Sequence, residues 1–65
     1  MEDSKGNKFD VGDTFYAEGC SKCIVTVIAI NNNVATLEGK LSHGVRPRFL
    51  YDQNAMKDSK WILVK

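Results

Sequence analysis

A chain of 65 residues is long enough for one small domain but too short to hold both a core and a deep substrate pocket. Its hydrophobic fraction of 43% is ordinary for a folded domain, and its net charge of +1 gives no overall basic field for nucleic acid. No apolar run approaches the ~18 residues of a membrane-spanning helix, and the polar start is no signal peptide, so we expect a cytoplasmic protein.

The start of the chain predicts a tail followed by a first strand. Residues 1–8 are polar and include a Gly-Asn pair, which predicts a flexible N-terminal tail ahead of a folded domain over residues 9–65. The chain then turns at Gly12 into a strand that we expect to run from Thr14 to Glu18.

A long hairpin is predicted at the centre of the chain. Residues 22–30 are rich in valine, isoleucine and threonine, as strands are, and three asparagines follow. Because asparagine tolerates φ > 0, a two-residue turn at Asn32-Asn33 is favoured. This register places Ile28 opposite Leu37 and points the two valines of the strand outward, whereas a three-residue turn would move them inward.

The next segment, residues 45–51, predicts a fourth strand. Its alternation points Phe49 and Tyr51 toward the core and the two arginines of the segment outward. Since Pro47 has no N–H to donate, the strand is expected to lie on an edge of the sheet or at a bulge at that residue.

The end of the chain predicts one helical turn and a last strand. Asp52 can cap a turn over residues 53–56, and residues 61–64 have the composition of a final strand. The side chains that we expect to be buried together in the core are Trp61, Phe49, Leu37 and Ile28.

This order of elements resembles the small SH3-like barrels, including the KOW-type variant, over residues 9–65. The resemblance is carried by Val11-Gly12-Asp13, the Ile24–Leu41 hairpin, and the Asp52–Lys60 turn that leads into the last strand. It implies an all-β fold, a five-stranded SH3-like barrel with one short helical turn before the last strand. The chain lacks the acidic loop and paired tryptophans of peptide-binding SH3 domains, so no proline-rich ligand is implied.

The segment Cys20-Ser21-Lys22-Cys23 has the spacing of a metal-ligand pair. A structural zinc site needs four ligands, and the preferred hairpin register brings only His43 near the two cysteines. A redox pair is expected at a helix N-terminus, but this one leads into a strand. The cysteines are also too close to staple a loop of useful size. We therefore interpret Cys23 as a strand residue and Cys20 as a loop thiol, both dispensable, with no metal or cofactor.

No catalytic arrangement is recognisable in the sequence. His43 is the only conventional general base, and its neighbour Ser42 cannot form a nucleophile–base–orienter arrangement with it across one turn. No glycine-rich phosphate loop is present. We expect a protein that is not an enzyme.

Two features predict a binding surface. Arg46 and Arg48 share one face of their strand, near Lys40, and can grip phosphate or carboxylate as a fork, although basic residues also deter edge-to-edge pairing. More apolar residues point outward than a core of this size can bury, which is typical of a protein interface. The candidate binding residues are Arg46, Arg48, Tyr16, Val25, Val27, Lys40 and Leu50.

These observations together favour a small non-enzymatic module that binds a larger protein. By analogy, the chain looks like the accessory proteins of bacteria and phages, some of which inhibit or redirect a host enzyme. The alternatives are a nucleic-acid-binding barrel of the KOW kind that uses Arg46 and Arg48, and a structural homo-oligomer.

Overall fold

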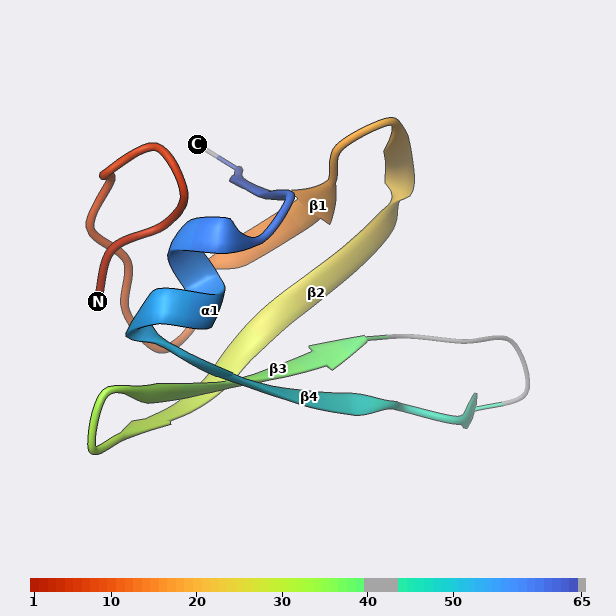
Figure 1. The fold of residues 1–65 in the computed structure, drawn as a ribbon. Helices are drawn as coiled ribbons and strands as arrows, with labels where there is room; N and C mark the ends of the chain where they lie inside the picture. The colour runs from red at the N-terminus through yellow and green to blue at the C-terminus, as the bar shows by residue number, and fades with distance from the viewer. Residues whose placement is uncertain (40–43, 65) are drawn as a thin grey trace.

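The computed structural model describes residues 1–39 and 44–64, which form one five-stranded antiparallel sheet and a short helix (Figure 1). The strand order is β4-β3-β2-β1-β5, and within the described residues β4 pairs with β3 alone and β5 with β1 alone. The predicted all-β fold is confirmed, with an open sheet. The bounds are β1 (Thr14–Ala17), β2 (Cys20–Asn31), β3 (Val34–Gly39), β4 (Arg48–Asp52), α1 (Gln53–Asp58) and β5 (Trp61–Leu63).

Two predicted local features are present where the sequence placed them. The hairpin between β2 and β3 turns at Asn32 and Asn33, whose φ angles of 52° and 62° lie in the left-handed region that asparagine tolerates. At the other end of the sheet, the Asp52 carboxylate accepts a 2.7 Å hydrogen bond from the N–H of Ala55 and so caps α1. β4 lies at an edge of the sheet, although Pro47 precedes the strand and its backbone faces β3.

The register of the central hairpin differs from the prediction because β2 contains a bulge. Close to the turn, Ile30 pairs with Ala35 as predicted, but beyond a register shift Leu37 pairs with Val27 and not with Ile28. Ile28 is therefore the extra residue of β2. Because side chains alternate between the two faces of a sheet, one extra residue reverses the orientation of everything before it in the strand. Val25 is turned inward by this shift.

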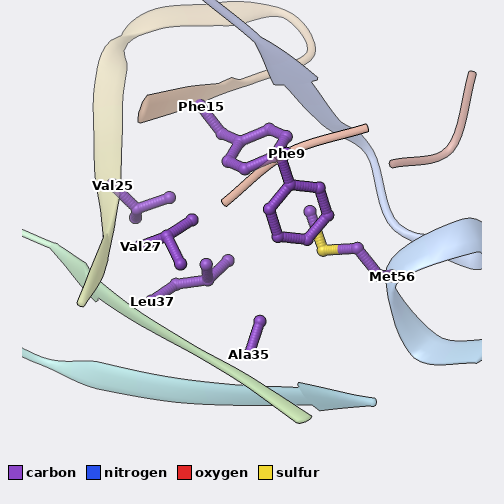
Figure 2. Close-up of a cluster of buried hydrophobic side chains, with 7 residues drawn as sticks. All are labelled: Phe9, Phe15, Val25, Val27, Ala35, Leu37 and Met56. Atoms are coloured by element: carbon purple, nitrogen blue, oxygen red, sulfur yellow. The ribbon is translucent and has the colours of Figure 1, made fainter. Parts of the chain in front are cut away.

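The core lies on one face of the sheet, here called the inner face, and Figure 2 shows its side chains converging. Phe9 and Phe15 pack edge to face, with ring centroids 5.0 Å apart and the rings at 89°. Met56 of α1 is completely buried against them. The buried apolar residues are Phe9, Phe15, Val25, Val27, Ala35, Leu37 and Met56.

The predicted core group is correct in part. Leu37 is fully buried, and Trp61 is half-buried against the core. Ile28 is 37% exposed because of the bulge, so its prediction was wrong. Phe49 is 40% exposed even though it lies on the inner face opposite Leu37, because within the described residues its edge strand has a neighbour on one side only.

The first eight residues form a hydrogen-bonded loop where the sequence predicted a flexible tail. The carboxylate of Asp3 is almost fully buried and accepts bonds from the backbone N–H groups of Lys5 (2.9 Å) and Asn7 (2.8 Å). Gln53 of α1 exchanges two further bonds with the backbone of Glu2, at 3.1 and 2.8 Å. Short polar side chains that satisfy their own backbone made this segment look unstructured in the sequence.

The bulge reverses the order in which two neighbouring truncations are expected to lower the free energy of unfolding. Val27→Ala should lower the free energy of unfolding by about 2 kcal/mol because it opens a cavity in the core. Ile28→Ala removes more atoms but should cost less than about 1 kcal/mol, since Ile28 is partly exposed. Urea unfolding of both variants measures the order, and a larger loss for Ile28→Ala would contradict the observed register.

The N-terminal loop gives a second stability prediction. Asp3→Ala leaves the N–H groups of Lys5 and Asn7 without their acceptor, which should cost about 1–3 kcal/mol. Lys5→Ala, at an exposed position of the same loop, is the matched control and should be neutral. Thermal unfolding compares the two variants. If both melt like the wild type, the loop does not contribute to the fold as the structure implies.

Candidate functional site

The candidate site is the face of the sheet opposite to the core, here called the outer face. Residues directly across from one another on paired strands share a face, so the register defines it. Ile62 of β5 lies opposite Tyr16 of β1, and Tyr16 lies opposite Ile24 of β2, so these three side chains form one row across the outer face. A second row starts with Thr14 of β1. By this rule the outer face carries Thr14, Tyr16, Ile24, Thr26, Ala29, Asn31, Val34, Thr36, Glu38, Arg48, Leu50, Asp52 and Ile62.

Exposed apolar side chains occupy two parts of the outer face. Ile24 is 50% exposed in the row with Tyr16, and Leu50 is 72% exposed on β4. The structure thus places Tyr16 and Leu50 on the predicted face. Val25 and Val27 are buried, so their prediction as outward binding residues was wrong, and the bulge is the reason. Ile24 takes their place on the surface.

The sequence contained a signal that Ile24, and not Val25 and Val27, lies on the outer face. Thr26 is the polar residue within the apolar stretch of β2, and Glu38 is the charged residue of β3. The observed register pairs these two with each other on the outer face. The predicted register instead placed Glu38 opposite Val27, so matching polar with polar residues would have required an extra residue in β2.

The two arginines of the predicted patch converge on one carboxylate. Arg48 donates from Nε to Oε2 of Glu38 at 3.2 Å, and Arg46 places Nη1 3.6 Å from the Oε1 atom. The Glu38 side chain is only 17% exposed, whereas both guanidinium groups project into solvent. Arg48 thus lies on the outer face, Arg46 reaches the same carboxylate from the segment before β4, and Glu38 is the negative partner of both. Exposed ion pairs of this kind add little stability and leave the arginines free to exchange partners.

A hollow of about 470 Å³ lies on the outer face beside Ile24. Thr26 and the backbone of Gly39 contribute to it, and its sides carry both charge signs, with Lys22 and Arg46 against Glu38. Such a mixed lining suits a side chain of a protein partner that has an apolar body and a polar end. The lining residues are Lys22, Ile24, Thr26, Glu38, Gly39 and Arg46.

Cys20 and Cys23 are joined by a disulfide. Ala17 pairs with Cys20 while Tyr16 pairs with Ile24, so the intervening residues 21–23 bulge out of β2 and the disulfide closes the bulge. This corrects the interpretation of Cys20 as a loop thiol. The bridge holds Lys22 at the rim of the hollow. His43, the third ligand considered, and Lys40 of the predicted patch lie outside the described residues.

Within 1–39 and 44–64, no group of three or more histidine, cysteine, aspartate or glutamate side chains is placed to hold a metal ion. In the same ranges, no helix has both the length and the apolar character needed to cross a membrane.

Comparison with known proteins gives no family for the chain. No family model, no curated protein and no solved structure matches it at a significant level.

The disulfide gives a testable stability difference. Cys20→Ser with Cys23→Ser should lower stability by at most about 2 kcal/mol, because the closed loop is so short that it restricts the unfolded chain little. Thermal unfolding with and without reductant measures the effect, and reduced wild type should melt like the double variant. Complete unfolding on reduction would contradict the prediction, because it would show that the bridge holds the domain together.

Proposed function

We propose that the protein is a small non-enzymatic binding module that docks on a larger protein through its outer face. The observation that carries the proposal is the exposure of Ile24 and Leu50 on the same face as a hollow with a charged rim. Apolar side chains surrounded by polar groups are the usual composition of a protein-binding patch. The strand order and the helix before β5 support an SH3-like layout, in which we infer that the sheet curls toward a barrel.

The charges around the hollow specify the chemistry of the partner. Lys22, Arg46 and Arg48 are exposed, whereas the carboxylate among them, Glu38, is mostly covered. The rim therefore presents a net positive charge to a partner. We propose a partner surface that offers an apolar side chain to Ile24 and carboxylates to the arginines, because arginine binds carboxylate in bidentate geometry.

The same charges argue against nucleic acid as the first choice. Glu38 lies between Arg46 and Arg48 and offsets one of their two positive charges. Few cations on the face also means that few counterions are released on binding, which keeps affinity low at physiological salt. Tyr16 is the aromatic side chain of the outer-face set, and one ring is a poor platform for stacked bases.

Charge reversal on the outer face tests the proposal. Arg46→Glu with Arg48→Glu should abolish retention of the partner, and Ile24→Lys should reduce it at least ~tenfold. Lys57→Glu with Lys60→Glu is the matched control, since it makes the same charge change at exposed positions outside the outer face. Quantitative mass spectrometry of proteins retained from a lysate of the source cells by each immobilised variant gives the comparison, and circular dichroism checks that each variant is folded.

Only a protein retained by wild type and by the control, but lost with both outer-face variants, supports the proposal. Equal retention by all variants would contradict it. Oligonucleotide binding is measured in parallel across a salt titration. Sub-micromolar affinity at physiological salt that is lost with Arg46→Glu and Arg48→Glu would make a nucleic-acid-binding barrel the better interpretation.

A further inference from the structure

β4 has one edge that no other strand of the described residues pairs with, here called the free edge, and this edge offers hydrogen-bonding groups to another strand. The N–H of Gly39 donates to the C=O of Pro47 at 2.8 Å, so these two residues form a hydrogen-bonded pair. Hydrogen-bonded pairs alternate along an antiparallel ladder, and the pairing of β3 with β4 has no register shift. The backbone groups of Arg48 and Leu50 therefore point away from β3, toward the free edge.

Pro47 does not block this edge. Proline lacks an N–H and usually protects a sheet edge against further pairing. Here the backbone of Pro47 faces β3, as its bond from Gly39 shows, so the missing donor is on the paired side. The donors of β4 that face outward are all present.

The sequence of β4 is complementary to itself when aligned in the opposite direction. It runs Arg48-Phe49-Leu50-Tyr51-Asp52, with a cation at one end, an anion at the other, aromatic residues inside them and leucine at the centre. We propose that β4 pairs antiparallel with β4 of a second copy of this chain, with the two-fold axis at Leu50. Arg48 then lies opposite Asp52 of the other copy, Phe49 opposite Tyr51, and Leu50 opposite itself.

Each of these contacts suits the side chains involved. Phe49 and Tyr51 lie on the inner face, where Phe49 is 40% exposed because no strand of the described residues flanks it on its free side. A second β4 supplies that strand and forms an aromatic cross-strand pair. On the outer face, Leu50, 72% exposed, meets its counterpart. One Asp52 oxygen caps α1 through Ala55, which leaves the other for an arginine.

The charge pattern favours a second copy over an unrelated extended segment. Antiparallel self-pairing brings opposite charges together at both ends of the strand, whereas a parallel arrangement would place Arg48 beside Arg48. This self-complementarity is the symmetry of a two-fold interface, in which one patch serves both partners. Since a five-residue strand pair is a small interface, we expect a dimer that forms at micromolar rather than nanomolar concentration.

Sedimentation equilibrium at concentrations up to about 1 mM tests the dimer. Wild type should approach twice the chain mass of 7.3 kDa. Leu50→Lys and Leu50→Glu should each remain monomeric, because each sets like charges across the axis. An equimolar mixture of the two should recover the doubled mass, since lysine then faces glutamate. Ile24→Lys, an exposed outer-face change away from β4, is the control and should dimerise like wild type.

Three results would overturn the inference. If the wild type has the mass of one chain at every concentration, β4 does not pair with a second copy. A dimer that survives Leu50→Lys, or that is lost with Ile24→Lys, would use a different surface. An equimolar mixture of L50K and L50E that stays monomeric would exclude antiparallel pairing centred on Leu50.

Discussion

The extra residue in β2 is the constraint on which the rest of the structure depends. Without the bulge at Ile28, Val25 and Val27 would lie on the outer face, and Thr26 would be turned toward the core. A bulge also increases the local twist and bend of a strand. β2 is long and pairs with β1 along one edge and with β3 along the other, as Figure 1 shows. The position of one residue thus decides which side chains form the core and which remain available for binding.

Two segments outside the sheet cover the inner face. α1 inserts Met56, and the N-terminal loop brings Phe9 against Phe15 (Figure 2). Gln53 joins these two segments by bonding to the backbone of Glu2. A small domain buries a limited share of its surface, so using both segments on one face leaves the outer face to solvent or to a partner.

The elements and their order could be predicted from sequence because local chemistry determines them. Two asparagines favour the turn, and Asp52 caps α1. The assignment of Val25 and Val27 could not be obtained in the same way, because a stretch with apolar residues at both alternating positions permits either face to be buried. The loop around Asp3 was missed since its order depends on α1, which is about fifty residues away in the sequence. Arg46 and Arg48 were placed correctly, but their shared partner Glu38 follows from strand pairing alone.

The meeting of the first and last segments has a consequence for how the domain folds. Glu2 bonds to Gln53 and Ser4 to Trp61, and β1 completes its pairing only with β5, so the contacts that finish the domain span 51 and 57 residues. Contacts between residues so distant in sequence form slowly, because a large loop must close before any of them is made. On the ribosome, the hairpin of β2 and β3 can form early, but β1 cannot complete its pairing until β5 has left the exit tunnel. The sheet is therefore completed only after β5 has been synthesised.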